Sequence, residues 1–583
     1  MQPACLEGLP GLETRLSHLS SEEVAVALEP LRARLLENLP PDESKALPSA
    51  ALGVCRRLFA HGRSRDALPV ARATLAHARS VNDDFLMRRA YAACGLLLGD
   101  VGDIVGAIEH HMRALELATE AKDSIEIARV WNNLGMAFAV CGNYELQMRC
   151  NLRVVDAVRH IEGPVYSRYT ACSNAANGKY QLGEYDEGLR YARRALAELT
   201  PAFLEEDLHG ALLLRRNFTY LLIATGNVEE AREHAEEVSK LAHRIQTPRA
   251  KVAEATTRAA LEIATGGFDI ALTRLDQALT RAREVPGLLR DTLVCAVRCE
   301  EAAGQPDRAL LRLKELADHV YDFAIERARK IVRLDDSSTD SQGAQDRELQ
   351  QANARLASKV EPREVPEGWD ALRRVAIGAA LRVDPTGWHG VRVGALTKAL
   401  ALEHGCRPLE AMEMGLAAEL HDIGLASVPQ GVLAKSGAPN EVERALIRRH
   451  IDAGAEILRD DRAPRILVAR EIARYHHARW DGIGYPERVG GQFIPLAARM
   501  CSIADAYDDL VSGAPGFEAH SMNDALHVLG RAAGSEFDPA LLVEFETMVR
   551  KQTREQDIDA EAAPGLEGFR QLIASLEEDR GFA

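Results

Sequence analysis

Seven glycines recur along the first half of the chain at nearly constant spacing, and this repeat constrains the fold more than any other feature. Each glycine lies between two segments whose apolar residues follow a helical period, where a glycine can end the first helix in a left-handed conformation. A repeat of this length in a helical pattern indicates stacked pairs of helices. The glycines are separated by 40, 40, 41, 43, 40 and 38 residues: Gly62, Gly102, Gly142, Gly183, Gly226, Gly266 and Gly304.

Small residues flank these glycines at two fixed distances. Five residues after the glycine, six of the seven repeats have Ala or Gly, with Gln147 as the exception, and most residues seven before it are also small. Small residues twelve positions apart across a tight turn allow two antiparallel helices to approach closely. On this basis residues 45–325 resemble tetratricopeptide repeats with helices or loops longer than in the usual unit of about 34 residues, and HEAT-like repeats are the alternative. We expect a solenoid that docks a protein or peptide, or else a scaffold without a specific ligand.

Seven side chains in the last third of the chain are candidate metal ligands. Two of the candidates are followed directly by another. If each adjacent pair is counted from its first member, the gaps are 32, 29, 26 and 29 residues, which suits ligands carried by different helices of a bundle. Apolar periodicity predicts these helices over 387–403, 409–420, 441–458, 466–479 and 496–511. Imidazole and carboxylate donors together favour iron or manganese, with zinc possible. The candidates are His389, His421, Asp422, His450, His476, His477 and Asp505.

The motifs around these positions resemble the HD-GYP family, a subgroup of the HD phosphohydrolases. The similar segments are His-Asp-Ile-Gly at 421–424, the double histidine with Asp-Gly-Ile-Gly-Tyr-Pro at 481–486, and Ala-Asp-Ala-Tyr-Asp at 504–508. The resemblance implies a phosphodiesterase with two metal ions that hydrolyses cyclic di-GMP to pGpG or GMP, and two adjacent metals suit this chemistry. It further implies that His389, His421 and Asp505 hold one metal with Asp422. The remaining histidines would hold the second, and Asp422, the catalytic residue, would bridge both.

Six residues are candidates for substrate binding. The Gly-Tyr-Pro turn is expected to shape a nucleotide pocket beside the double histidine. Arg479 and Arg499 are candidate phosphate contacts because a guanidinium fork matches phosphate oxygens, and surface salt bridges are their alternative role. His404 lies outside the pattern and is not a candidate ligand. The six residues are Arg479, Asp481, Gly484, Tyr485, Pro486 and Arg499.

The chain departs from the family pattern at several positions. Leu425 stands where the family has a lysine, Ala478 stands where it has a glutamate, and Ala514–Phe517 replaces an Arg-Pro-Tyr segment. Pro385 occupies the position of a third-metal glutamate, so we expect no third metal. Three hypotheses remain open: a cyclic di-GMP phosphodiesterase of reduced activity, a catalytically weak or inactive nucleotide receptor or docking module, and a phosphohydrolase for another nucleotide.

The predicted organisation is all-α, with a tetratricopeptide-like solenoid joined through a helical linker to an HD-GYP bundle. The linker contains Leu349, Leu356 and Val360 at helical spacing, which predicts either a dimerising coiled coil or an ordinary linker helix. The expected segments are an N-terminal segment at 1–44, the array at 45–325, the linker at 326–366, the phosphohydrolase domain at 367–550 and a helical tail at 551–583.

Charge and hydropathy restrict the partners. A formal net charge of −16 argues against DNA binding, which depends on neutralising phosphates with cations. The sequence has neither a long apolar run nor the pattern of a signal peptide, and its ten cysteines include no C-x-x-C pair. We therefore expect a cytoplasmic protein with reduced thiols that contacts no membrane.

Overall fold

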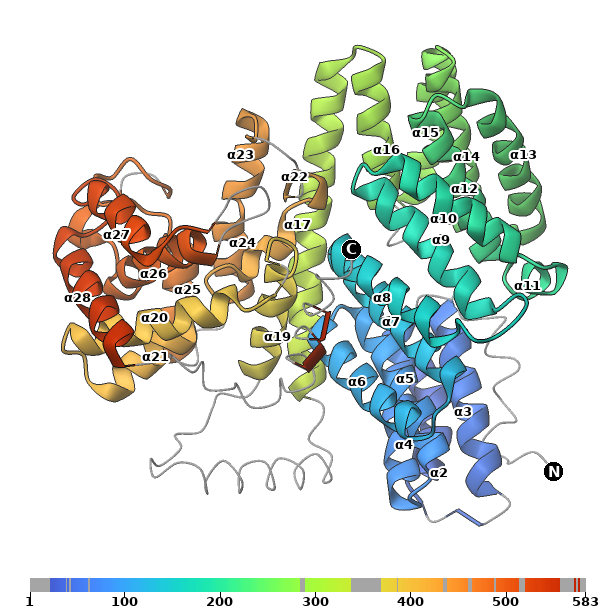
Figure 1. The fold of residues 1–583 in the computed structure, drawn as a ribbon, viewed down its shortest axis with the longest axis horizontal. Coiled ribbons are helices and arrows are strands. Elements are labelled where there is room, and N and C mark those ends of the chain that lie inside the picture. The colour runs from blue at the N-terminus through green and yellow to red at the C-terminus, as the bar shows by residue number, and fades with distance from the viewer. Residues whose placement is uncertain are drawn as a thin grey trace. The chain divides into compact units, whose positions relative to one another are not determined.

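The computed structural model is all-α in the part of the chain that it describes (Figure 1). This part comprises residues 21–336 and 369–555, with gaps at 38, 41–42, 61–62, 284–288, 385, 434–437, 460–463, 487–488 and 513–518, and residues 571, 572, 575 and 576. Two compact units are present, one formed by Met1–His319 with Glu567–Ala583 and the other by Val320–Leu566. Among the helices described, none combines the length and the apolarity needed to span a membrane.

The first unit is a succession of antiparallel helix pairs, preceded by α2 (Ser21–Leu35). The first helices of the pairs are α3 (Glu43–Ala60), α5 (Asp84–Val101), α7 (Ser124–Cys141), α9 (Tyr166–Gln181), α12 (Leu208–Ala224), α14 (Pro248–Ala264) and α16 (Leu289–Ala302). The second helices are α4 (Ser64–Ser80), α6 (Ile104–Glu120), α8 (Tyr144–Ala157), α10 (Tyr185–Glu198), α13 (Val228–Ile245), α15 (Phe268–Ala282) and α17 (Pro306–Asp336), and a short helix α11 (Pro201–Glu206) lies between two pairs. Each second helix before α17 packs on its own partner and on the first helix of the next pair. The tetratricopeptide-like solenoid is therefore confirmed.

The repeated glycines end the first helices as the spacing predicts. The six of them that the structure describes have a positive φ, from 66° at Gly304 to 107° at Gly102. A residue with a short polar side chain then begins the second helix in two of the turns. Asp103 accepts a hydrogen bond from Gly106 N, and Asn143 accepts one from Leu146 N. The turn thus satisfies backbone groups on both sides, which fixes the length of the connection.

The small residues twelve positions apart lie at the closest approach of the paired helices. The Cys55 thiol lies 3.6 Å from the carbonyl oxygen of Ala67. A methyl group added to Gly188 would lie 3.4 Å from the carbonyl oxygen of Ala176 and only 2.5 Å from a Leu221 methyl. Because larger side chains do not fit there, the spacing of small residues is a packing requirement of each pair.

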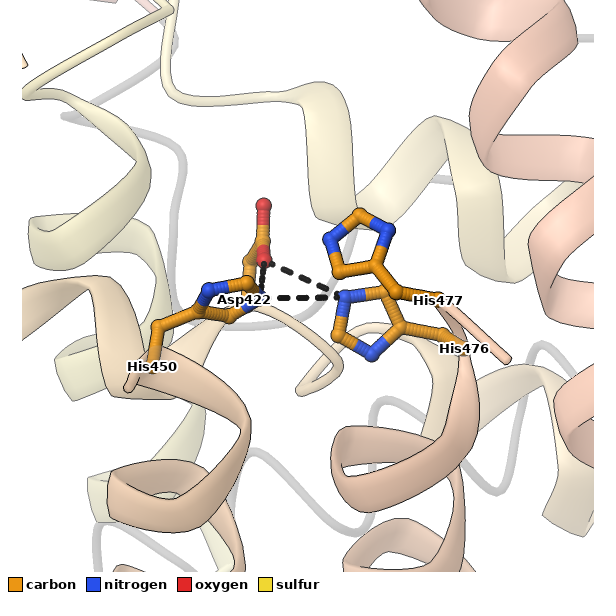
Figure 2. A group of neighbouring side chains, drawn as sticks. All are labelled: Asp422, His450, His476 and His477. Carbon is orange, nitrogen blue, oxygen red and sulfur yellow. Dashed lines mark hydrogen bonds and ion pairs between the residues drawn. The ribbon is translucent and has the colours of Figure 1, made fainter. Parts of the chain in front are cut away.

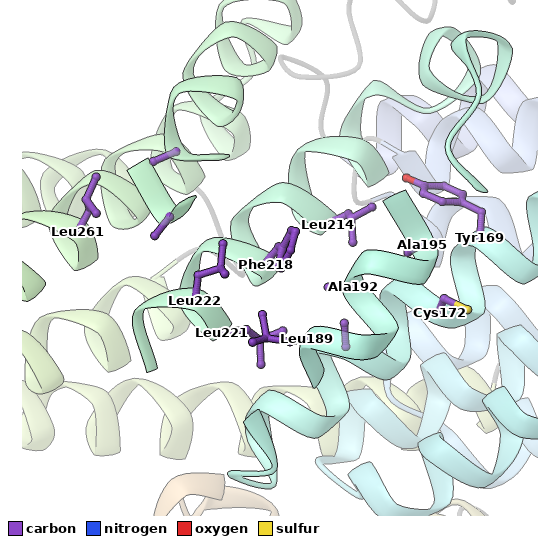
Figure 3. Close-up of a cluster of buried hydrophobic side chains, with 13 residues drawn as sticks. Tyr169, Cys172, Leu189, Ala192, Ala195, Leu214, Phe218, Leu221, Leu222 and Leu261 are labelled. Atoms are coloured by element: carbon purple, nitrogen blue, oxygen red, sulfur yellow. The ribbon is translucent and has the colours of Figure 1, made fainter. Parts of the chain in front are cut away.

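The core of the array is built from alanine, leucine and a few aromatic residues. Figure 3 shows one cluster, in which Tyr169 from α9, Leu189 and Ala192 from α10, and Phe218 from α12 pack together. Leu261 of α14 belongs to the same cluster, so apolar contact continues from one pair to the next. Each repeat is thus stabilised mainly by its neighbours.

The second unit is a bundle that begins within α17, because the boundary between the units falls at residues 319 and 320 of that helix. Its helices are α19 (Trp369–Ala380), α20 (His389–Glu403), α21 (Pro408–Ala418), α22 (Gln430–Leu433), α23 (Glu441–Arg448), α24 (His450–Ile457), α25 (Pro464–Tyr475), α26 (Leu496–Ser512), α27 (Met522–Arg531) and α28 (Pro539–Glu555), with short 3-10 turns η2 (Ile423–Ser427) and η3 (Gly491–Phe493). The helix predicted over 441–458 is divided at Arg449, and the one predicted over 466–479 ends at Tyr475.

Several sequence expectations lie outside the described residues. They concern Gly62, the linker with Leu349, Leu356 and Val360, Pro385 and the segment 514–517. In the predicted tail, Leu572 and Leu576 are helical and fully buried. There the carbonyl oxygens of Ser575 and Leu576 accept hydrogen bonds from Arg153 and Arg149 of α8.

Candidate metal centre

The seven candidate ligands come from five parts of the bundle, mostly from the ends of helices. His389 and His450 are the first residues of α20 and α24, and Asp505 lies within α26. The two adjacent pairs, His421-Asp422 and His476-His477, lie just beyond α21 and α25. Within a helix, neighbouring side chains point about 100° apart. Because both pairs lie beyond the end of a helix, the two side chains of each pair can face the same centre.

The structure brings these side chains together in two groups. One contains His389, His421 and Asp505, and in each group the ligand atoms lie within 4.8 Å of one another. Figure 2 shows the other, in which Asp422, His450, His476 and His477 converge from three segments. The seven residues chosen from the sequence are therefore adjacent in space.

Asp422 lies between the two groups. Its Oδ1 is 3.4 Å from His450 Nε2 and 3.6 Å from His476 Nε2. Its Oδ2 is 3.5 Å from His421 Nε2, and this nitrogen is 3.4 Å from Asp505 Oδ1. One carboxylate thus presents one oxygen to each group, which is the arrangement required of a bridging ligand.

The backbone fixes the orientation of three of the histidines. The Nδ1 atoms of His421, His450 and His476 donate to the carbonyl oxygens of Ala418, Ile447 and Ile472, at 2.9, 2.6 and 3.1 Å. A histidine that donates through Nδ1 presents the lone pair of Nε2. All three Nε2 atoms therefore face the centre as acceptors, as in histidines that ligate metals.

A carboxylate fixes the fourth histidine. Asp508 Oδ2 accepts from His389 Nδ1 at 2.8 Å, which directs His389 Nε2 toward Asp505 Oδ1 at 3.0 Å. Arg392 holds Asp508 by donating from Nε at 2.7 Å and from Nη2 at 2.9 Å. We did not predict this role for Asp508, although its position three residues after Asp505 on one helix places both on the same face.

The donor atoms fit divalent cations, as two local features indicate. His421 Nε2 is buried and forms no hydrogen bond within the described residues. The Nε2 atoms of His450 and His476 lie 3.3 Å apart with both Nδ1 atoms donating elsewhere, so two lone pairs face each other. A cation satisfies the unpaired nitrogen and removes the repulsion. Imidazole and carboxylate donors suit a borderline metal.

The charge state of the centre also favours cations. Burial opposes ionisation of Asp422 and Asp505, but the neighbouring histidines hold the pKa of both carboxyl groups well below the ordinary value. Burial lowers the pKa of His477 well below its ordinary value, and His476 and His450 add to this effect. For His389, burial is outweighed by Asp505 and Asp508, which raise its pKa to about 10. The centre thus holds ionised carboxylates, which attract cations.

The Gly-Tyr-Pro loop lies beside the second group. The rings of Tyr485 and His477 are 4.9 Å apart between centroids. Gly484 permits this approach, because an added methyl group would lie 2.6 Å from the His477 carbonyl oxygen. Pro486 follows through a cis peptide bond. Asp481 Oδ1 accepts from Ile483 N at 3.0 Å and thereby shapes the turn.

The two arginines chosen as phosphate contacts form ion pairs within the protein. Arg479 contacts Asp481 at 2.8 Å and Glu536 at 3.3 Å. Arg499 pairs with the buried carboxylate of Asp538 at 2.5 Å and donates to the Ile494 carbonyl oxygen at 3.0 Å. Both guanidinium groups therefore already hold acidic partners that a phosphate would have to replace.

Two positions that depart from the family pattern, Leu425 and Ala478, are buried. Leu425 is 6% exposed in η2, and its carbonyl oxygen accepts a hydrogen bond from Arg382. Ala478 packs in an apolar cluster with Ile494 and Ala498. These mostly apolar surroundings suit an alanine at 478 better than a charged glutamate. His404, which we excluded as a ligand, is exposed and contacts Glu544 instead.

Comparison with known proteins finds similarity in the bundle. Residues 375–541 match the model of the HD domain. The 3'3'-cGAMP-specific phosphodiesterase 2 of Vibrio cholerae is 36% identical over 141 residues, covering 24% of this chain and 27% of that protein. The cyclic di-GMP phosphodiesterase response regulator RpfG of Xanthomonas campestris is 33% identical over 233 residues, covering 39% of this chain and 60% of that protein.

A third relative is the cyclic di-GMP phosphodiesterase of Thermotoga maritima, 31% identical over 196 residues, covering 31% of this chain and 53% of that protein. The chain thus spans between about a quarter and three fifths of the length of these relatives. The C-terminal bundle thus matches the HD domain model over residues 375–541, and the expected similarity to phosphodiesterases of cyclic dinucleotides is confirmed.

Proposed function

We propose that the chain, which carries its HD domain at residues 375–541, is a metal-dependent phosphodiesterase of cyclic dinucleotides, with cyclic di-GMP as the first candidate. One observation supports this more than any other: Asp422 presents one oxygen to each of two histidine groups. Hydrolysis of a phosphodiester requires an activated water and stabilisation of charge on the leaving oxygen. Two metals, iron or manganese by the donor set, supply both when they are bound.

The residues of the chain position the reactants. We assign His389, His421, Asp422 and Asp505 to one metal, and the remaining three histidines with Asp422 to the second. Asp508 keeps His389 in the ligating orientation through its Nδ1 hydrogen bond. Tyr485 lies over His477 and forms one wall of the space in which a nucleotide would lie. Water attacks phosphorus and one phosphorus–oxygen ester bond breaks, giving pGpG or, after a second cleavage, GMP.

The relatives differ in the purine bases of their named substrates. One is named for cyclic di-GMP and another for 3'3'-cGAMP, and both molecules carry two phosphodiester bonds in a dinucleotide ring. The metal centre acts on the phosphodiester and does not distinguish these bases. We therefore propose the shared phosphodiester as the reacting group in a cytoplasmic signalling enzyme.

Turnover assays with anaerobic iron and with manganese test the proposal. We expect hydrolysis of cyclic di-GMP or 3'3'-cGAMP by the full chain and none by Asp422→Asn. Binding of a dinucleotide without turnover under both metals would instead support the alternative function, a nucleotide receptor. Turnover of a different nucleotide alone would support the third hypothesis.

Leu425 makes the receptor function a specific alternative. Its buried side chain cannot contact phosphate as an ammonium would. If the missing charge limits turnover, Leu425→Lys should raise the rate roughly tenfold or more, since one preorganised charge contributes on the order of 10²–10³. Leu425→Met is the control for volume. No gain with metal content unchanged would show that the substrate charge is neutralised elsewhere.

We further propose that the array docks a protein or peptide and regulates the HD domain. A partner can change activity only if it binds two states of the chain with different affinity. The test should retain α17, because Tyr321 of this helix stacks with Arg449 at 4.8 Å. It should omit residues 567–583, which belong to the first unit. We expect a fragment of residues 305–566 to bind metal and to differ in activity from the full chain. Equal activity of the fragment and the full chain would indicate that the array only localises the protein.

A further inference from the structure

We propose that Arg448 is the cation that binds a substrate phosphate at this centre, an inference that rests on the proposed function. Arg448 is the last residue of α23, and its guanidinium carbon lies 5.0 Å from the centroid of the Tyr485 ring. The same ring lies 4.9 Å from that of His477. A single aromatic ring, that of Tyr485, therefore contacts both Arg448 and the candidate metal ligand His477.

Other arginines near the centre are occupied by carboxylates. Arg392 holds Asp508, Arg479 holds Asp481, and Arg499 holds Asp538. Arg448 is exposed, and among the described residues it contacts no carboxylate. In this part of the chain its guanidinium lies against the face of Tyr485. A guanidinium that stacks on an aromatic ring keeps its five N–H donors available at the edge, where they can bind phosphate oxygens in pairs.

The two phosphates of the substrate favour such a group. A cyclic dinucleotide brings two negative phosphates to a centre that already contains Asp422, Asp505 and Asp508. The two metal positions can serve the phosphate that reacts, but the second phosphate also needs a cation. Leu425 cannot supply one. Arg448 lies at the rim, where the second phosphate of the ring can reach it while the first is held at the metals.

The backbone keeps Arg448 in a defined relation to the metal ligands. His450 lies two residues after Arg448 and donates from Nδ1 to the carbonyl oxygen of Ile447. Arg448 lies between these two hydrogen-bonded residues. The alternative role of Arg448 is to stabilise the C-terminal end of α23, where a cation interacts favourably with the helix dipole. The two roles differ in their consequences for substrate binding.

Steady-state kinetics with cyclic di-GMP and with 3'3'-cGAMP, together with binding of a phosphorothioate analogue of cyclic di-GMP, test the proposal. We expect Arg448→Gln to raise KM and to weaken binding of the analogue roughly 10- to 100-fold, the usual range for a hydrogen bond to a charged group. The loss should be equal for both dinucleotides. Arg448→Lys should recover part of it, because the charge remains without the planar fork.

Salt dependence and metal content separate phosphate binding from a structural role. The plot of log affinity against log salt should become shallower in Arg448→Gln, because one contact between opposite charges that salt screens is lost. Metal content should remain unchanged. Arg444→Gln is the matched control, because Arg444 lies one turn earlier on α23, is exposed and donates to the Pro439 carbonyl oxygen.

Three outcomes would overturn the inference. They are an unchanged KM and salt slope, a loss confined to one dinucleotide, which would indicate a base contact, and a loss of metal in Arg448→Gln. Wild-type protein that neither binds nor cleaves either dinucleotide would reject the proposed function, and the inference with it. Normal wild-type turnover with no effect of Arg448→Gln would reject the inference alone.

Discussion

The array and the HD domain are both built from helices, but they differ in how far apart in sequence the contacting residues lie. In the array, each helix packs on those next to it in sequence, and the residues at the closest contacts are small and repeated. In the HD domain, the centre depends on residues far apart in sequence, such as His389 and Asp505, and none of them is repeated. Substitutions in the array should therefore have modest effects on stability, whereas one substitution at the centre can abolish function.

The largest effect is expected at Asp422. Asp422→Asn retains the shape of the side chain but removes the charge that faces both histidine groups. We expect turnover to fall by at least about 10²–10³, as on loss of a preorganised charge, together with a loss of bound metal. His404→Gln is the control, because His404 lies outside the centre and contacts Glu544. Retention of two metals in Asp422→Asn would contradict a bridging role.

Metal removal should affect the thermal stability of the two units differently. A ligand present at 100 times its Kd stabilises the folded state by about 2.7 kcal/mol. Chelation should therefore lower the melting transition of the HD domain and leave that of the array in place. Calorimetry of the full chain with and without manganese measures both transitions. An equal shift of both would show that the metals stabilise the chain as one cooperative body.

A smaller effect is expected at Asp508, which acts through His389. Asp508→Asn removes the carboxylate that orients the imidazole, and such changes cost roughly 10- to 100-fold in metal affinity. Competition with a chelator measures the affinity. Asp509→Asn is the matched control, because Asp509 is the adjacent carboxylate and lies 3.9 Å from His389 Nδ1. Similar losses in both variants would indicate that only the total negative charge matters.

The sequence revealed the seven clustered His and Asp residues but not all of the groups that support them, for a physical reason. Side chains that could bind a metal belong to a few residue types at fixed places, so their identity and order are visible in the chain. Among the partners of Arg479 and Arg499, Glu536 and Asp538 lie more than thirty residues away, and any acidic residue there could serve. The stacking of Arg448 on Tyr485 likewise depends on how α23 meets the Gly-Tyr-Pro loop.

The array was more predictable, because each of its signals is local. A glycine with positive φ and small residues at fixed distances are needed within every pair, so the period appears in the sequence. The predicted dimerisation and the ligand of the array remain predictions. Dimerisation and ligand binding both depend on residues at the protein surface, and many residue types at the surface are compatible with the same fold.

The smallest effect on stability is expected at the repeated glycines. It tests whether the repeats are as uniform in stability as they are in spacing. Gly226 has φ of 80°, and an added methyl group would meet no atom within 4 Å. The cost of Gly226→Ala is therefore conformational alone, about 1–2 kcal/mol for a left-handed residue. Gly226→Asn should lose less, because asparagine tolerates this conformation, and the chain itself has Asn82 at φ 51°. The same changes at Gly183, whose surroundings are equally open, should cost the same in denaturant unfolding. Unequal losses at the two positions would show that individual pairs unfold separately, and the array would then resemble the HD domain in having positions that cannot be exchanged.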